Sequence, residues 1–599
     1  MKSRYRVTLL TLILLITSCA IGDDTPPARI TDLTSDVVTR VLSWTAPGDN
    51  GNSGRATIYF PRFLDDEQVA EILGVPNLDG VPFVEIEAAV IENFDDATQV
   101  PDFEQPEPAG SPETFLTPRL DISGETSYFY SIRTNDEVGN SSKPSNVAEL
   151  TTPLQDITYV NQEPGSCLGA SVTGANFNGD LDDQNLEIND IAVGDPCAGR
   201  VYIFFGQNDL TEDGSTVIDV SNADVTVIGN PADGFGASLA STPDFEGDPR
   251  ADELVVGAPE FDGGRGKVYY VFGSRDLPSV IDLVGGDVDH LEVVGENPGD
   301  NFGFSVQSGA GILNGSGVII VGAPFFNAST GKAYVFKGPD LQQNIENPAS
   351  TATATFTGQS AGGLFGFSLA LLGRIDTNSR NEFGIGAPGL GRAYVIKGRN
   401  DLQSRDLATD TTDVLILEGS AGDEFGFSIS GNGDIDEDGE GIPDVIVGAP
   451  STDMGSGSVF LYSGEVLRES FENGTEPTVE TEFTGSGPGD MFGFSVSVIP
   501  TLTPEIVEKQ RDTAIVLEFE ISNADFGVGA PGSPPGAAFV FFGRDDFPAV
   551  VSAGEADIVL TGGEGDSDFG IVFEGLRDVN GDQLDDFGVG GEGFMQIDY

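Results

Sequence analysis

Four oxygen-bearing side chains near the C-terminal end of the sequence are spaced as ligands of a hard cation. Asp578, Asn580, Asp582 and Asp586 occupy positions 1, 3, 5 and 9 of one loop, and Gly581 at position 4 permits a tight turn. Calcium takes about six to eight oxygen ligands at about 2.3–2.6 Å, and such ligands converge in loops of this kind. The spacing therefore predicts a calcium site.

Similar loops recur upstream. Two sets keep the acidic pattern: Asp244, Glu246, Asp248 and Asp252, and Asp434, Asp436, Asp438 and Asp444. An insertion interrupts a third set, which consists of Asn176, Asn178, Asp180 and Asp190. The alternative for every loop is a solvated turn, because Asp, Asn and Gly favour turns without any metal. We expect a structural role, in which each ion neutralises clustered carboxylates and rigidifies its hairpin.

Each loop lies inside a cassette that the sequence repeats seven times between residues 156 and 599. A Phe-Gly or Leu-Gly pair opens each cassette, at Leu168-Gly169, Phe235-Gly236, Phe302-Gly303, Phe365-Gly366, Phe425-Gly426, Phe492-Gly493 and Phe569-Gly570. An apolar run ending in Gly-Ala-Pro or a variant follows, then an aromatic run, and a fourth apolar run separates the cassettes. Four strands per unit indicate one blade of a β-propeller. Cassettes three, four and six depart from the acidic pattern.

These cassettes resemble FG-GAP repeats, and the array is similar to the seven-bladed β-propeller at the head of integrin alpha subunits. The resemblance covers about three-quarters of the chain. It implies EF-hand-like calcium loops between strands and a closed ring. Since the seventh cassette stops after its third strand, we expect Ile157–Val160 to supply the fourth strand and to remove the open sheet edges. An open solenoid is the alternative.

Residues 28–153 show the short alternating runs and turn residues of an immunoglobulin-like β-sandwich. The single Trp44 on an early strand, the aromatic strand around Tyr128 and Tyr130, and a closing Ser-Asn-Val strand resemble a fibronectin type III module. We expect Trp44 in the core. Residues 62–112 are acidic and Pro-rich and depart from that pattern. The predicted fold class is all-β, with this sandwich preceding the seven-bladed propeller.

The N-terminal residues have a pattern that is typical of a targeting segment. Its charged start consists of Lys2, Arg4 and Arg6. Residues 7–16 are apolar but too few to span a bilayer. The run Leu15-Ile-Thr-Ser-Cys19 resembles a bacterial lipobox, which implies a signal peptide over 1–18, lipidation of Cys19 and a tether over 19–27. Ala20 implies the outer membrane by the same resemblance, with the lipid as the membrane anchor. An ordinary signal peptide is the alternative.

The charge balance is strongly acidic, with 97 acidic against 28 basic residues and a net charge of −69. Nucleic acids and anionic membrane surfaces require a basic face, so neither is an expected partner. Cys167 and Cys197 both fall in the first cassette. In an oxidising compartment they would pair, for about 3 kcal/mol of stability. Two free thiols are the alternative. The single His290 is remote from both, which argues against zinc.

No pairing of a nucleophile with a base stands out in the sequence, so we expect no enzyme. We favour a surface-anchored adhesion module that binds a protein or carbohydrate. By the integrin resemblance, recognition would use loops opposite the acidic ones, such as residues 259–265 and 450–454. Two alternatives remain: an outer-membrane scaffold without an external ligand, and a carbohydrate-active enzyme that uses a pair of carboxylates.

Overall fold

The computed structural model describes residues 27–598 apart from several gaps. The gaps are 37–40, 48–57, 74, 76–77, 79–80, 82, 95–97, 100–111, 117–125, 136–140, 153–156, 181–187, 207–216, 243–250, 287–289, 314–315, 339–342, 437–440, 501–504, 512–513, 521–522, 533–534, 545–546, 564–567, 580–584 and 592. The chain divides into two compact units. One comprises residues 1–118, 126–152 and 508–518, and the other comprises 119–125, 153–507 and 519–599. Within the described residues, no helix has the length and apolar character needed to cross a membrane.

The first unit contains two antiparallel sheets. One has the order β1 (Thr34–Asp36), β2 (Val41–Thr45), β5 (Pro112–Leu116), and the other β4 (Thr98–Gln99), β3 (Ile58–Asp65), β6 (Thr126–Asn135), β7 (Ala148–Thr152). Trp44 on β2 is buried and meets Tyr59 on β3 edge to face, with ring centroids 5.4 Å apart. Because the rings come from different sheets, the sheets pack face to face. The prediction that Trp44 is a core residue is confirmed.

Two helices occupy the middle of this unit, where the sequence departs from a sandwich pattern. They are α1 (Asp66–Leu73) and α2 (Phe83–Glu92). Val69 on α1 and Val90 on α2 are buried in one cluster with Phe129 on β6. Apolar side chains three to four residues apart form the stripe by which these helices pack on the sheet. These two helices were not predicted from the sequence.

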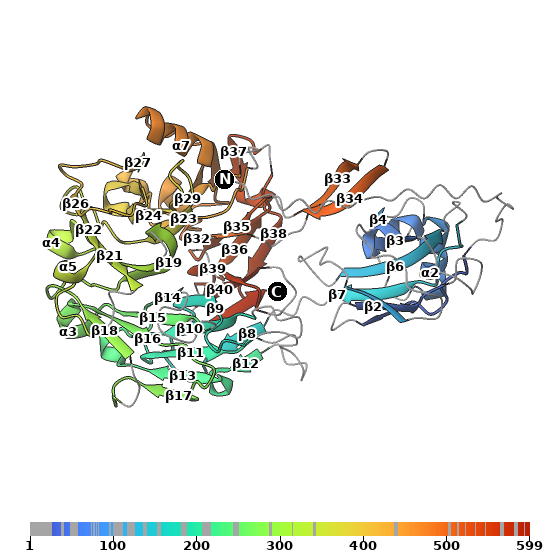
Figure 1. The fold of residues 1–599 in the computed structure, drawn as a ribbon, viewed down its shortest axis with the longest axis horizontal. Helices are drawn as coiled ribbons and strands as arrows, with labels where there is room; N and C mark the ends of the chain where they lie inside the picture. Colours follow the sequence, from blue (N-terminus) through green and yellow to red (C-terminus); the bar gives the residue numbers. More distant parts are fainter. Residues whose placement is uncertain are drawn as a thin grey trace, which may run out of the picture. The chain divides into compact units, whose positions relative to one another are not determined.

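The second unit consists of seven sheets within the described residues, each built on four antiparallel strands (Figure 1). Blades one to three are β9 (Ser171–Ala175), β10 (Asp190–Asp195), β11 (Arg200–Phe204), β13 (Val225–Ile228); β14 (Ser238–Thr242), β15 (Glu253–Ala258), β16 (Lys267–Val271), β18 (His290–Val294); and β19 (Ser305–Leu313), β20 (Ser316–Ala323), β21 (Lys332–Lys337), β22 (Ala354–Thr357). Blades four to six are β23 (Leu369–Gly373), β24 (Glu382–Ala387), β25 (Arg392–Ile396), β27 (Val414–Glu418); β28 (Ser428–Gly431), β29 (Val445–Ala449), β30 (Ser458–Tyr462), β31 (Thr481–Thr484); and β32 (Ser495–Ile499), β35 (Asp525–Ala530), β36 (Ala537–Phe541), β38 (Ile558–Thr561). Blade seven is β39 (Val572–Arg577), β40 (Asp586–Gly591), β41 (Phe594–Asp598) and β8 (Ile157–Val160).

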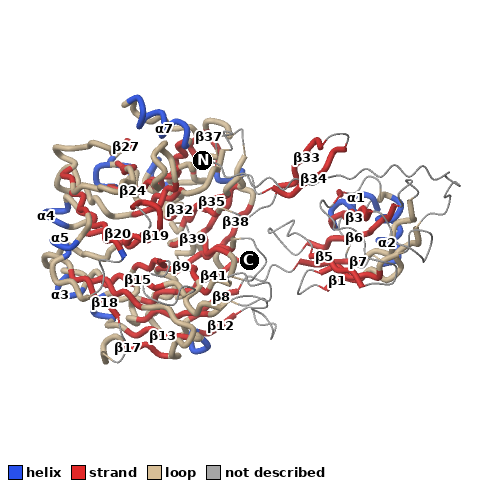
Figure 2. The backbone as a smooth tube through the Cα atoms, viewed as in Figure 1, coloured by secondary structure: helices blue, strands red, loops and turns tan. Residues whose placement is uncertain are grey.

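Short elements lie in the connections between these strands (Figure 2). Four strands extend blades at their outer edge: β12 (Val217–Asp219), β17 (Val280–Asp282), β26 (Arg405–Asp406) and β37 (Val550–Ser552). In the sequence, the hairpin of β33 (Glu505–Arg511) and β34 (Ala514–Glu520) follows β32 and precedes β35, and its residues 508–518 belong to the first unit. The helices are α3 (Phe261–Gly264), α4 (Phe326–Ser329), α5 (Pro348–Thr351), α6 (Thr452–Gly455) and α7 (Gly464–Asn473).

The ring closes as the sequence predicts. The innermost strands lie side by side in the order β9, β14, β19, β23, β28, β32, β39, and β39 lies beside β9. β8 pairs antiparallel with β41, placing Ile157 opposite Ile597, so the strand before the first cassette completes the last blade. This confirms a closed seven-bladed propeller and excludes an open solenoid.

The repeated glycines explain how closely neighbouring blades pack. In every blade the N–H of the Phe-Gly or Leu-Gly glycine donates to the carbonyl of the Gly-Ala-Pro glycine, as Gly426 does to Gly448 at 3.0 Å. A Cβ on Gly448 would lie 2.1 Å from the carbonyl oxygen of Gly493 in blade six. Only glycine permits this approach of two backbones.

In six of the seven blades, a serine two residues after the Phe-Gly or Leu-Gly glycine bonds one blade to the next. The Ser428 hydroxyl donates to the carbonyl of Gly493 at 2.8 Å. Equivalent bonds join the other pairs from blade one to blade seven: Ser171 to Gly236, Ser238 to Gly303, Ser305 to Gly366, Ser368 to Gly426 and Ser495 to Gly570. Blade seven carries Val572 at this position, so the junction that closes the ring has no hydroxyl to donate.

Candidate metal centre

The acidic loop of blade five joins β28 to β29, at the end of the blade opposite Gly448. Asp434, Asp436 and Asp444 each present a carboxylate oxygen, and these three atoms lie within 4.8 Å of one another. Oxygens that share a calcium ion at about 2.3–2.6 Å are at most about 5 Å apart. The three carboxylates therefore fit one calcium ion. The fourth predicted ligand, Asp438, lies outside the described residues.

Asp444 also fastens the loop to the blade. Its Oδ2 accepts the N–H groups of Ile435 at 2.7 Å and Asp436 at 3.1 Å, and its Oδ1 accepts the N–H of Gly464 at 2.7 Å. Burial, followed by the nearby charge of Asp436, raises the pKa of Asp444 to about 8. A bound cation would favour the ionised carboxylate and offset this burial cost.

The same fastening by a buried acid recurs in other blades. Asp190 in blade one accepts two loop N–H groups on Oδ2 and the N–H of Gly206 on Oδ1. Asp525 in blade six makes the second of these contacts, because it accepts the N–H of Gly543 at 2.9 Å, although the loop there departs from the acidic pattern. We call this arrangement the carboxylate clasp. Its presence in blade six indicates a structural role that is separate from metal binding.

The predicted ligands of blade one converge on one another. The N–H of Asp180 donates to Oδ1 of Asn176 at 3.1 Å and of Asn178 at 2.9 Å, and Nδ2 of Asn178 donates to Oδ2 of Asp180 at 2.9 Å. Oδ1 of Asp180 is buried without a hydrogen-bond partner in the part of the chain that the structure describes. Burial raises the pKa of Asp180, and it raises that of Asp190 to about 8. A buried oxygen in this position fits a cation.

An internal ammonium group occupies the loop of blade four. Lys397, which follows β25, places Nζ 3.1 Å from Oδ2 of the buried Asp376. Glu382 takes the place of Asp444, because it accepts two loop N–H groups at 2.7 and 3.2 Å. The Lys397 ammonium also lies 4.4 Å from the ring centroid of Phe471 on α7. The positive charge that calcium would bring is thus supplied by the chain itself.

Blade seven is described in part. Asn580 and Asp582 lie outside the described residues, whereas Asp578 and Asp586 lie within them. Asp586 is buried and accepts the N–H of Val579 at 2.7 Å, as expected of a clasp. The ends of this loop therefore have the arrangement seen in blade five.

In blade two, the strand register identifies a buried acid that the spacing of the predicted metal ligands did not reveal. Asp244, Glu246 and Asp248 lie outside the described residues. Glu253 pairs with Thr242 at the end of the inner strand, as Asp190 pairs with Ala175 in blade one. The predicted ligand Asp252 precedes this position, and its Oδ2 accepts the N–H of Asn176 from blade one at 3.3 Å. Glu253 is therefore the counterpart of the clasp acid, because the loop of blade two is one residue longer than that of blade seven.

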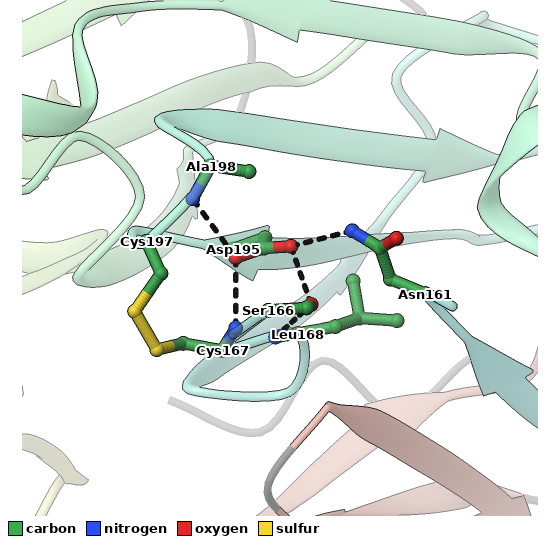
Figure 3. The surroundings of a disulfide bond; sticks show 7 residues. All are labelled: Asn161, Ser166, Cys167, Leu168, Asp195, Cys197 and Ala198. Atoms are coloured by element: carbon green, nitrogen blue, oxygen red, sulfur yellow. Dashed lines mark hydrogen bonds between the residues drawn. A yellow bond between two sulfur atoms is a disulfide. The ribbon is translucent and has the colours of Figure 1, made fainter. Parts of the chain in front are cut away.

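A second buried carboxylate holds the loop between β8 and β9, where the ring closes (Figure 3). Asp195 accepts the side chains of Asn161 at 2.8 Å and Ser166 at 2.7 Å, and the backbone N–H of Cys167 at 2.9 Å. Cys167 forms a disulfide with Cys197, and their Cα atoms lie 5.4 Å apart. The lipidation candidate Cys19 lies outside the described residues. Blade one thus replaces the alanine of Gly-Ala-Pro by an acid that fixes the closing loop.

Half-buried phenylalanines line the opposite end of the blades. Phe304, Phe367, Phe427 and Phe494 each follow a Phe-Gly pair, and successive ring centroids are 4.9, 4.9 and 4.7 Å apart. We call them the phenylalanine arc. They belong to blades three to six, at the Gly-Ala-Pro end and away from the acidic loops. Met454 on α6, in a connection at the same end, is 85% exposed.

Comparison with known proteins supports the repeat assignment. No family model matches the chain. The chain is similar to integrin alpha-IIb of Mus musculus, with 30% identity over 248 residues, covering 39% of this chain and 21% of that protein. It is 32% identical to integrin alpha-5 of Xenopus laevis over 253 residues, covering 39% and 21%, and 30% identical to integrin alpha ina-1 of Caenorhabditis elegans over 223 residues, covering 33% and 18%. The matches span about a fifth of the length of these relatives.

Among solved structures, the Dos1 propeller is 12% identical with a TM-score of 0.33, covering 95% of this chain and 92% of that chain. Sqt1 from Chaetomium thermophilum is 13% identical with a TM-score of 0.38, covering 74% and 98%. Seven cassettes whose Phe-Gly and Gly-Ala-Pro landmarks meet at each blade, together with the integrin relatives, identify the repeat region as an FG-GAP, integrin alpha-like β-propeller.

Proposed function

We propose that this protein is a bacterial adhesion or binding lipoprotein, without enzymatic activity, whose propeller recognises a protein or glycan and is stabilised by calcium. Cys19 would anchor it to the outer membrane, and the unit within residues 28–153 would act as a fibronectin type III-like spacer. The integrin alpha relatives support a binding role for the repeat region. The calcium part rests on the carboxylates of blade five.

The phenylalanine arc is the observation that carries the binding proposal. Its four rings stay half-buried although they pack against one another, so an apolar surface remains partly open to solvent. Aromatic side chains and methionine are enriched in the contact surfaces of protein complexes. Loops 259–265 and 450–454 lie at the same end and can add specificity, because connections on a rigid scaffold vary freely.

A ligand array tests the binding proposal. The full-length protein would be applied to immobilised extracellular matrix proteins and polysaccharides in calcium buffer. We expect at least one reproducible hit that the double variant Phe427→Ser, Met454→Asp loses. The matched control is Val284→Asp, which alters an exposed apolar residue in the connection after β17. If both variants bind equally, the recognition surface does not include the phenylalanine arc or Met454. Hydrolysis of an arrayed glycan would favour an enzyme instead.

Calcium is tested separately by titration calorimetry on protein stripped with chelator. We expect binding with a stoichiometry above one, and loss of one site in the variant Asp434→Asn, Asp436→Asn. The control is Asp525→Asn, which weakens a carboxylate clasp in a blade without the acidic pattern. A stoichiometry unchanged by the blade-five variant would refute the assignment of that loop.

Membrane anchoring is tested by fractionation. Cys19→Ser should move the protein from the membrane fraction to the soluble fraction in a bacterial host, since the lipid would be the anchor. Retention of the variant in the membrane fraction would contradict the lipoprotein assignment.

A further inference from the structure

The outer edge of each blade is covered by the chain of the following blade, with one exception. The covering segment lies between the third and fourth strands of that next blade. Starting with blade seven and continuing through blades one to five, the covering segments and the outer strands that they cover are β12 on β8, β17 on β13, Ile345 on β18, β26 on β22, α7 on β27 and β37 on β31. Covering an edge with a strand, a helix or a loop prevents unwanted strand pairing.

Blade six lacks this cover among the described residues. Its outer strand, β38, is the last strand of its sheet. The cover should come from a connection between β41 and β8 in blade seven. Those strands come from opposite ends of the propeller sequence, so no connection joins them. Among the described residues, the outer edge of β38 therefore has no paired segment, and Val559 on this strand is 51% exposed. We call it the open edge.

The covered blades show which backbone groups a strand on this edge would engage. In blade one, Thr226 donates its N–H to the carbonyl of Ser279 at 2.9 Å, and the carbonyl of Ile228 accepts the N–H of Leu283 at 3.0 Å. In blade six, Val559 has the same register position against the third strand as Thr226 has in blade one. Thr561 likewise has the position of Ile228. The N–H of Val559 and the carbonyl of Thr561 are therefore the groups presented by the open edge.

Two of the covers, β17 and β37, also share a side-chain pattern. In β17 and the residue after it, Val280 is exposed while Ile281 and Leu283 are buried, and β37 repeats this order with Val550, Val551 and Ala553. A Leu-Pro or Phe-Pro pair precedes each segment. The two buried side chains fill the outer end of the core between adjacent blades. Between blades six and seven, the core has the half-buried Leu560, Phe542 and Val160 at its margin and no such segment among the described residues.

We propose that the open edge of β38 is a docking site for an extended segment of a partner protein, which adds as a parallel strand. The segment would carry two apolar side chains two residues apart, preceded by an apolar residue and proline, because the covers β17 and β37 do. Strand addition of this kind draws affinity from main-chain hydrogen bonds and specificity from alternate side chains. The site is independent of the phenylalanine arc and of calcium.

A peptide with the sequence of residues 275–284, Arg-Asp-Leu-Pro-Ser-Val-Ile-Asp-Leu-Val, is the probe. Hydrogen exchange of the full-length protein is followed with and without it. We expect slower exchange in residues 556–562 and no change in residues 224–229, which the chain's own β17 already covers. A peptide with Ile281→Asp and Leu283→Asp should have no effect. Absence of protection at 556–562, or protection at 224–229 instead, would overturn the proposal.

Variants of Val559 give the second readout, by anisotropy of the labelled peptide. Val559→Pro removes the outward N–H and should weaken binding by at least about fivefold, since a net hydrogen bond and the fit of the strand are lost. Val559→Thr places there the residue found in blade one and should bind as the wild type does. Equal binding by all three proteins would contradict strand addition. A dimer of the wild type that Val559→Pro dissociates would assign the edge to a second copy and also overturn the proposal.

Discussion

Replacing Lys397 by methionine would test whether an internal ammonium substitutes for calcium in blade four. Methionine keeps much of the apolar length of lysine but removes its charge. The Nζ atom lies 3.1 Å from Oδ2 of Asp376, and the two side chains are 17% and 5% exposed. Removing one partner of a buried ion pair costs about 3–5 kcal/mol, because the remaining charge is left uncompensated. The residual exposure of Lys397 reduces this to about 2–3 kcal/mol.

The second part of this prediction concerns calcium. Without Lys397, the carboxylates of Asp376 and Glu382 share one loop with no cation, as the acids of blade five do. Burial and the charge of Asp376 raise the pKa of Glu382 to about 7, so a cation that stabilises the ionised carboxylate of Glu382 would bind favourably. We therefore expect added calcium to restore part of the stability that Lys397→Met loses.

Thermal melts in chelator and in excess calcium provide the assay. In chelator the variant should melt several degrees below the wild type, and calcium should raise its melting temperature by more than that of the wild type. The matched control is Lys337→Met, the equivalent residue of blade three, for which no ion pair is found within the described residues. Phe471→Leu separates the loss of the ring contact from the loss of charge. If Lys397→Met melts as the wild type does in both buffers, the ammonium has no such role.

Three further predictions follow from the packing and the buried acids. Gly448→Ala should destabilise the propeller by about 1–3 kcal/mol in denaturant melts, since its Cβ would meet a neighbouring carbonyl at 2.1 Å, whereas Gly422→Ala, with nothing nearer than 3.9 Å, should be neutral. In chelator, stability should fall as pH rises from about 4 to about 8, because the folded state holds a proton on Asp444, whose pKa is about 8, that the unfolded state has lost. Asp444→Asn should flatten that slope, and calcium should stabilise the wild type most at high pH; a slope unchanged by the variant would contradict the assignment. Cys167→Ser should lower stability by about 3 kcal/mol under oxidising conditions and by much less in reductant.

The ring could be predicted from the sequence because its periodic residues have backbone reasons to recur. Gly448 and its equivalents face a carbonyl of the next blade, so such a glycine is present in every blade. The number of blades can therefore be read from the number of these glycines. The missing fourth strand of blade seven then led to Ile157–Val160, which the structure places beside β41. The predicted metal ligands of blade five lie together for the same reason, since strand ends fix the loop on both sides.

What escaped prediction depends on contacts between residues remote in sequence. Lys397 lies beyond the loop that it fills, so the acidic spacing alone could not show it. A signal exists in retrospect, because lysine precedes the glycine after the third strand in blades three and four, at Lys337 and Lys397, where the loops lack the acidic pattern. Glu253 was missed because the loop of blade two is one residue longer than that of blade seven, and strand register rather than ligand spacing identifies it.

The clasp and the cation have separable roles, and this bears on how calcium can act. Six blades carry a buried acid at the start of the second strand, whereas blade three has Val318 there. The clasp acids of blades one and six bond a glycine after the third strand, and blade six does so without the acidic pattern. The serine bonds between blades lie at the opposite end and involve no acid. Loss of calcium should therefore loosen particular hairpins while the ring, and the phenylalanine arc at its other end, stay assembled.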